Sequence, residues 1–356
     1  MLDIQFIREN KDLLRFSLER RGVVADLDAL VHVDDERKKA GDNKALLEEL
    51  LATWRALMLT VPNLLDISVP AGKKDEYMFE LRTGAVTEAQ PTRSLAEMHA
   101  KYGVVSSLKN NEVTTRRYTG ESASIYELLR NYVLRELRFE NSMYNHAQLG
   151  VSKDALIAGQ IFDADADKNM YLAPLGYVPE YAHIYGLETQ VGKSYEQPQL
   201  PAFVISEGAI VNRNHAAPAL SSAVSILALS EPSHQVSVTI HETITAKVEL
   251  LLTTLGLPHT VSVRTALYTP VYAVKSYHLA LMVGEEKVPL TDTAYMHDFL
   301  SRRLGVKMKN QDGKTRFVHM ACMTGISLDV LFDAFVCAHD DAPLRAQALT
   351  QQHPSV

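Results

Sequence analysis

Apolar residues at the start of the chain recur at the three- and four-residue spacing of an amphipathic helix. The clearest stripe runs from Leu47 to Met58. Gly22 follows two arginines, as is typical of a helix end, and Gly41-Asp42-Asn43 is typical of a turn. The pattern predicts helices before Gly22, from Asp26 to Lys39 and after Asn43. The last two form an antiparallel hairpin whose arms of about 15 residues span roughly 22 Å.

Further along the chain, helical stretches mix with short apolar runs bounded by proline or glycine. Helices are predicted from Ser124 to about Tyr144, near Val236–Leu255 and over Ile326–Ala338. Strands are predicted at Met170–Ala173, Ala202–Ile205, Ala223–Leu229, His259–Val263 and Leu279–Val283. Because helices and strands do not alternate strictly, an α+β fold is favoured over a parallel doubly wound sheet.

A loop rich in proline, glycine and lysine marks a domain boundary between about Asp66 and Thr92. We expect a helical domain with a short antiparallel arm at residues 1–80, an α+β domain at residues 90–345, and a flexible tail at residues 346–356. The length of 356 residues, with 46% hydrophobic and 22% charged residues, suits a globular protein of this size.

Charge and composition exclude several classes of protein. Lysine and arginine number 36 against 43 acidic residues, so the basic surplus typical of nucleic-acid binding is absent. The 2 cysteines, Cys322 and Cys337, exclude a disulfide scaffold and a cysteine zinc site. No apolar run is long enough to cross a membrane. The opening Met1–Ile4 lacks signal-peptide character, so we expect a cytoplasmic protein, or one in an organelle matrix if an upstream presequence has been removed.

General catalytic motifs are missing from the sequence. It contains no GxGxxG, GxxxxGK[ST] or GxSxG. The segment His241–Thr245 begins like a zinc-binding helix but lacks the second histidine. Asp163, Asp165 and Asp167 alternate as in a calcium loop, yet the required glycine and glutamate are absent. Neither a metal nor a cofactor is therefore expected.

Longer segments carry a more specific signal. They are Met1–Asn10, Asp26–Leu30, Val61–Leu64, Ser68–Gly72, Tyr171–Pro174, Ser206-Glu207, Leu255–Pro258, Asp298-Phe299 with Arg302-Arg303, and Gly325–Ser327. In this order they resemble bacterial-type seryl-tRNA synthetases, from the N-terminal helices through the serine pocket and motif 2 to motif 3. The resemblance implies a class II aminoacyl-tRNA synthetase-like fold, in which helices flank an antiparallel sheet preceded by a shortened helical hairpin.

The resemblance also identifies positions where this chain departs from the family. Class II adenylation needs arginines that hold the phosphates of ATP and neutralise charge in the transition state. The motif 2 arginine falls at Ile205 and the motif 3 arginine at Val330. An acidic residue that helps to hold the metal and ATP falls near Pro289. These three lost ATP-site positions imply that no catalytic residue of the adenylation reaction remains.

A remnant of the substrate pocket is implied by the positions of Tyr177, Glu207, Arg213, Asp292 and Thr324. The favoured hypothesis is a pseudoenzyme that has lost serine activation and tRNA charging and acts as a dimeric scaffold or regulatory partner. An alternative is a repurposed enzyme that binds or transforms a small amino-acid-like substrate in a biosynthetic pathway. A third hypothesis is an authentic synthetase with a different alignment, which an ATP-binding measurement would separate from the others.

Partners are implied by the same resemblance. The family dimerises through a motif 1 helix, which here corresponds to an amphipathic segment containing Leu129, Tyr132, Val133 and Leu137. We expect a homodimer, or a heterodimer with a seryl-tRNA synthetase. The alternative is that this stripe packs only on its own sheet. Because the hairpin is short and the net charge is −7, strong tRNA binding is not expected.

Overall fold

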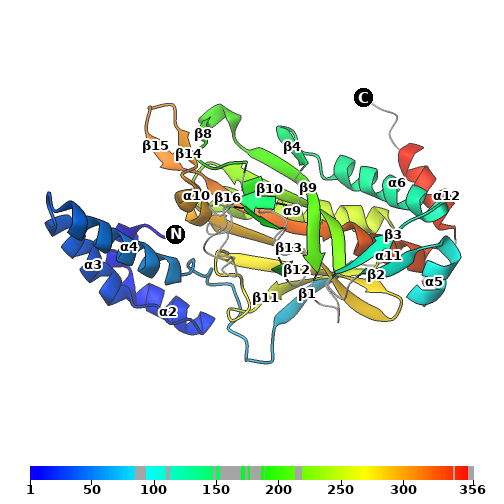
Figure 1. Ribbon diagram of the computed structural model, residues 1–356, viewed down its shortest axis with the longest axis horizontal. Helices are drawn as coiled ribbons and strands as arrows, with labels where there is room; N and C mark the ends of the chain where they lie inside the picture. Colours follow the sequence, from blue (N-terminus) through cyan, green and yellow to red (C-terminus); the bar gives the residue numbers. More distant parts are fainter. Residues whose placement is uncertain are drawn as a thin grey trace.

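The computed structural model describes residues 1–84, 94–109, 113–146, 150–152, 170–172, 175–176, 186–187, 189–212, 219–339 and 341–351. A helical lobe occupies one end of the long axis, and a large sheet with its own helices forms the rest (Figure 1). The lobe contains α1 (Ile4–Glu9), α2 (Lys11–Arg21), α3 (Leu27–Lys39) and α4 (Lys44–Thr60).

The N-terminal helices begin and end where the sequence predicts. Asp3, Asp26 and Asn43 precede α1, α3 and α4, and each side chain accepts a hydrogen bond from an amide of the first turn. Helix α2 ends at Gly22, whose φ of 63° is a left-handed conformation that glycine adopts without steric cost. Helices α3 and α4, of 13 and 17 residues, pack together. The predicted hairpin with its tip near Gly41 is confirmed.

The described part of the second region contains an 11-stranded mixed sheet and two smaller sheets. The main path runs β1-β11-β12-β13-β16-β10-β3-β2, and β9 pairs with β10, β4 and β7. Most neighbours are antiparallel, whereas β3 with β10, and β4 and β7 with β9, are parallel. The strands of the large sheet are β1 (Met78–Gly84), β2 (Val105–Lys109), β3 (Val113–Arg117), β4 (Ser142–His146), β7 (Leu175–Gly176), β9 (Ala202–Asn212), β10 (Ala219–Ser230), β11 (His259–Arg264), β12 (Lys275–Val283), β13 (Glu286–His297) and β16 (His319–Ser327).

Shorter elements complete this region. The small sheets comprise β8 (Ser194–Glu196), β14 (Lys307–Lys309) and β15 (Thr315–Phe317), and β5 (Gly150–Ser152) with β6 (Met170–Leu172). The helices are α5 (Leu95–Tyr102), α6 (Glu121–Glu136), the 3₁₀ helix η2 (Gln197–Gln199), α9 (His234–Thr254), α10 (Phe299–Leu304), α11 (Leu328–Ala338) and α12 (Ala342–Gln351). The predicted α+β fold with a sheet flanked by helices is therefore confirmed.

One predicted helix is partly wrong. The sequence pattern extends a helix from Ser124 to about Tyr144, but α6 ends at Glu136 and Ser142–His146 forms strand β4. Asn141 has a φ of 42°, a conformation that a right-handed helix excludes and that asparagine tolerates better than most residues. The chain therefore turns between α6 and β4, so that β4 can lie beside β9.

Helices α9 and α11 cover one face of the sheet, which we call the helix-covered face. Thr293 of β13 contacts α9 directly, because its hydroxyl lies 3.0 Å from Nε2 of His241 and 2.8 Å from the hydroxyl of Thr245. Apolar side chains from the strands pack with those of α6, α9, α11 and α12 in the larger core. Its strand members include Phe203, Ile205, Val224, Ile226, Tyr277, Leu279, Met323 and Ile326.

The opposite face packs against the helical lobe and α10 in a second core. Arg21 of α2 anchors the lobe to the sheet region: it is 4% exposed and donates to the main-chain carbonyl oxygens of Asn63, Thr269, Pro270 and Ala273. Because these acceptors are main-chain atoms on two separate segments, one side chain joins parts of the chain that are far apart in sequence.

Candidate functional site

A row of buried polar side chains crosses the opposite face of the sheet. Ile205, Ile226, Met323 and Thr293 lie side by side on four neighbouring strands. Because Thr293 points toward α9, these four side chains are on the helix-covered face. Side chains alternate along a strand, so the residues next to these point to the other face. The row comprises Ser206 on β9, Ser225 on β10, Thr324 on β16, Asp292 on β13 and His278 on β12, and as whole residues none of them is more than 7% exposed.

Asp292 is the centre of this row. Its Oδ2 accepts a hydrogen bond of 2.7 Å from Nε of Arg264, and its Oδ1 lies 2.6 Å from Nδ1 of His278. Because an ionised carboxylate only accepts, Nδ1 of His278 carries the hydrogen. Thr324 completes the site through its hydroxyl, which accepts from the Asp292 amide at 3.0 Å. The structure thus brings two of the predicted pocket residues, Asp292 and Thr324, into contact.

The charge on Asp292 is compensated inside the protein. Burial alone would raise the pKa of its carboxyl, but the guanidinium of Arg264 and the imidazole of His278 outweigh burial and lower that pKa from its ordinary value. The carboxylate is therefore ionised at neutral pH. Its side chain is 3% exposed, against 13% for that of Arg264, so the arginine side chain is the more exposed member of the pair.

Glu207, a third predicted pocket residue, lies elsewhere. It is two residues beyond Ile205 on β9 and points to the helix-covered face, where Arg130 of α6 binds it through two hydrogen bonds of 2.5 Å from Nε and Nη2. Nδ1 of the exposed His146 lies 3.5 Å from the same carboxylate. Glu207 and Asp292 therefore belong to separate ion pairs, with the sheet between them. Tyr177 and Arg213 lie outside the described residues.

Comparisons with known proteins find similarity to seryl-tRNA synthetases. The Seryl-tRNA synthetase N-terminal domain model matches residues 1–52. Serine--tRNA ligase of Borrelia garinii subsp. bavariensis is 23% identical, over 92% of this chain and 91% of its own. That of Caldanaerobacter subterraneus subsp. tengcongensis is 24% identical, over 94% and 93%.

Solved structures share the whole fold. The cytoplasmic Serine-tRNA ligase of Naegleria fowleri, in complex with AMP, superposes with a TM-score of 0.80 and 15% identity over 99% of this chain and 98% of its own. The seryl-tRNA synthetase of Pyrococcus horikoshii, complexed with ATP, superposes with a TM-score of 0.75 and 16% identity over 99% of this chain and 98% of its own. The chain is therefore similar to seryl-tRNA synthetases along nearly its whole length and shares their fold.

The three positions that the family resemblance assigns to the ATP site hold apolar side chains in this seryl-tRNA synthetase-like chain. Ile205 is 1% exposed within the larger core. Val330 lies in the first turn of α11 and lines a pocket of about 720 Å³ with Arg116, whose guanidinium is bound by Asp333 at 2.8 Å. Pro289 is half-buried on β13 opposite Ala280. The structure does not bring Ile205 together with Asp292, because they face opposite sides of the sheet.

The stripe predicted as a dimer surface is buried within the single chain. Leu129, Tyr132, Val133 and Leu137 are at most 5% exposed and belong to the larger core. These four side chains therefore stabilise the protomer and do not form an exposed surface. Large exposed apolar side chains instead follow α6 on β4, where Met143 is 39% and Tyr144 is 50% exposed.

Sequence reasoning missed three residues of these ion pairs: Arg130, Arg264 and His278. Each is a common residue type outside any motif, and each acts through a partner 14 to 77 positions away. A usable signal is that Arg264 and His278 stand in runs of strand-type residues, where a charged side chain needs a buried partner. The sequence shows that a partner is required without showing which one.

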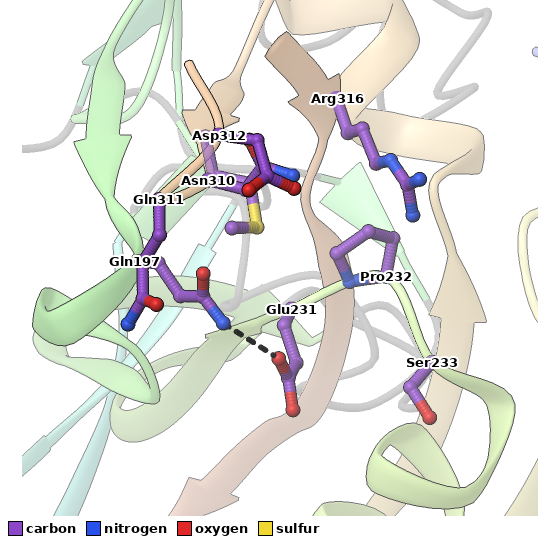
Figure 2. Close-up of a pocket in the computed structure, with 9 residues that line it drawn as sticks. Gln197, Glu231, Pro232, Ser233, Asn310, Gln311, Asp312 and Arg316 are labelled. Carbon is purple, nitrogen blue, oxygen red and sulfur yellow. Dashed lines mark hydrogen bonds between the residues drawn. The ribbon is translucent and has the colours of Figure 1, made fainter. Parts of the chain in front are cut away.

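A second polar pocket, of about 370 Å³, lies between the β14–β15 hairpin, η2 and the start of α9. Figure 2 shows Gln197 donating to Glu231, at 3.5 Å, with Arg316 on the side of Pro232 and Ser233. The remaining residues of its wall are Met308, Asn310, Gln311 and Asp312. This pocket shares no residue with the predicted substrate pocket, and its charges are mixed in sign.

Metal-ligand clusters and membrane helices were sought across the part of the chain that the structure describes. No group of three or more histidine, cysteine, aspartate or glutamate side chains there is arranged to hold a metal ion. Within the same residues, no helix combines the length and the apolar character needed to span a bilayer.

Proposed function

We propose that this seryl-tRNA synthetase-like chain has lost ATP-dependent serine activation and tRNA charging, and that it acts as a dimeric scaffold or regulatory partner. The observation that carries the proposal is the absence of cations from three elements. Strands β9 and β10 and helix α11, which correspond to motifs 2 and 3, contain no arginine or lysine. Adenylation places a negatively charged triphosphate against these elements and needs cations there.

This argument does not depend on a single alignment. If the motif 2 position were shifted by one residue from Ile205, it would fall on Val204 or Ser206, and neither carries a charge. A shift along α11 from Val330 meets only apolar residues, Asp329 or Asp333. The hypothesis of an authentic synthetase with a different alignment is therefore disfavoured.

Serine-dependent exchange of pyrophosphate with ATP tests the proposal. Purified protein should show no exchange above a blank, while an active serine--tRNA ligase assayed in parallel shows it. Exchange that depends on serine and grows with protein concentration would refute the loss of activation. Calorimetry with ATP gives a second readout, in which we expect no saturable heat.

The proposed partner is a second copy of the chain or a related seryl-tRNA synthetase. Support comes from β4, on which Met143 and Tyr144 are exposed, because methionine and tyrosine are enriched at protein–protein interfaces. We infer weak tRNA binding from the short α3–α4 hairpin and the net charge of −7. A gel shift with serine tRNA at physiological salt tests this, with a tight complex as the contrary result. The proposed location is the cytoplasm or an organelle matrix.

The repurposed-enzyme alternative is supported by the buried row around Asp292, where a carboxylate, an imidazole and a guanidinium meet on one face. Such a group could bind a small amino-acid-like molecule. A thermal-shift screen of amino acids distinguishes the two functions, because a pseudoenzyme that binds no amino acid gives no shift.

A further inference from the structure

We propose that Asp292 forms a guanidinium-binding site whose occupant is the chain's own Arg264. The inference deepens the proposed function, on which it rests: the Asp292 carboxylate is closed to free cations, amino acids included, because a tethered side chain already binds it. The ligand class is a planar cation, which a carboxylate binds through directed hydrogen bonds.

The path of the Arg264 side chain supports this reading. Arg264 is on β11 and Asp292 is on β13, and β12 lies between them. Across these strands Ser262 pairs with His278, and His278 with Asp292. Arg264 lies two residues beyond Ser262, the residue of β11 that is in line with His278 and Asp292. Its side chain therefore reaches diagonally across β12 to the carboxylate. The guanidinium thus lies on the same face of the sheet as Asp292 and Thr324.

Burial shows which partner covers the other. The Asp292 side chain is 3% exposed and that of His278 is 9% exposed, whereas that of Arg264 is 13% exposed. The guanidinium therefore covers a carboxylate that is already enclosed by the sheet. A free cation could reach Asp292 only by displacing Arg264.

Both carboxylate oxygens of Asp292 are engaged, Oδ2 by Arg264 and Oδ1 by His278. A tethered group competes at an effective concentration of millimolar or above, so a free ligand of equal intrinsic affinity must exceed that concentration to displace it. The site is therefore saturated by its own side chain. An added guanidinium compound should leave the wild-type protein unchanged and should bind only when the Arg264 side chain is removed.

The test is chemical rescue of the Arg264→Ala variant. Removing one partner of a buried ion pair should lower its Tm by roughly 5–10 °C. Ethylguanidinium chloride at about ten times its dissociation constant should then raise the Tm of the variant by roughly 2–4 °C relative to equal sodium chloride. The wild-type Tm should not respond.

Two control variants test whether the rescue by ethylguanidinium occurs at Asp292. Arg264→Ala combined with Asp292→Asn lacks the acceptor charge and should show no rescue. Arg82→Ala removes a guanidinium from the exposed pair with Glu249, where Nε and Nη2 of Arg82 both bind the carboxylate, and should also show none. Rescue of this surface variant would mean that ethylguanidinium stabilises the fold nonspecifically, which would overturn the proposal.

A wild-type Tm in the Arg264→Ala variant, or a low Tm that ethylguanidinium does not change, would also overturn the proposal. If the variant is recovered only from aggregates, its refolding yield is the readout. At least a twofold gain with ethylguanidinium over sodium chloride supports the site, and equal yields refute it. Because these readouts measure stability, they can fail while pyrophosphate exchange remains absent, so the two proposals are tested separately.

Discussion

Glu207 and Asp292 point to opposite faces of one sheet, and each carboxylate is bound by an arginine from a different element. Arg130 of α6 binds Glu207, and Arg264 of β11 binds Asp292. In both pairs the arginine side chain is more exposed than the acid. The acidic residues implied by the family's substrate pocket are thus neutralised within this chain, although they do not form one pocket.

Restoring an arginine at Ile205 should destabilise the protein without giving activity. The side chain at this position is 1% exposed in the larger core, and Glu207, two residues away on the same face, is already bound by Arg130. An unpaired buried charge costs on the order of 3–5 kcal/mol. Urea unfolding of Ile205→Arg should show this loss, and Ile205→Val should lose about 1 kcal/mol. An arginine variant of wild-type stability would contradict the assigned face of β9.

Removal of Arg130 should lower the free energy of unfolding, because Glu207 would remain buried without its cationic partner. The variant Arg130→Ala leaves a carboxylate whose side chain is 11% exposed without its main donor, and we expect a loss of about 1–3 kcal/mol. The double variant Arg130→Ala/Glu207→Gln removes the charge and should recover part of this loss. Equal stability of the single and double variants, measured by urea unfolding, would show that the pair contributes nothing through charge.

Three histidines meet where β13, β16 and α9 approach one another. Nε2 of His297 lies 3.1 Å from Nδ1 of His234, and its ring centre lies 4.9 Å from that of His319. Burial, followed by the charges of His319 and His234, lowers the pKa of His297 to about 4, against smaller raising effects from Asp298 and Asp66. His297 is therefore neutral in the folded protein at pH 6.

The pH dependence of stability follows from this shift. Between about pH 6.5 and pH 4 the unfolded chain binds a proton at His297 that the folded chain does not, so stability should fall as pH falls through this window. The variant His297→Asn should flatten the slope, since asparagine tolerates the φ of 50° at this position. The exposed His32→Asn is the matched control. Identical slopes for His297→Asn and the wild type would contradict the prediction.

Dimerisation should depend on β4 and not on the buried stripe of α6. We expect light scattering to give about twice the monomer mass of 39.6 kDa. Replacement of Met143 and Tyr144, both exposed, by lysine should shift the protein toward monomer with little change in Tm, because neither side chain is buried. A wild-type monomer at all concentrations, with no related synthetase chain bound in native extracts, would refute the proposed partner.

Local patterns explain which elements the sequence predicts. Caps and glycines define the N-terminal helices, β-branched residues define β11, and the apolar run Leu279–Val283 defines the end of β12. Strand β13 escaped prediction because Thr291-Asp292-Thr293 resembles a polar loop. The polar side chains of this run are satisfied by Arg264, His278, the Gly325 amide and α9, none of them close in sequence. The ion pairs depend on strand register, including an irregularity between Leu279 and Ala280, and one sequence does not encode that locally.

The hydrogen bonds of Arg21 couple the unfolding of the helical lobe to that of the sheet region. Its hydrogen bonds reach main-chain carbonyls of Asn63 and of the segment from Thr269 to Ala273, and Asn63 in turn donates to the carbonyls of Tyr272 and Met296. Fraying of the lobe would leave these enclosed carbonyls without donors, so loss of either region weakens the other. We therefore expect the helical lobe and the sheet to unfold as one cooperative unit.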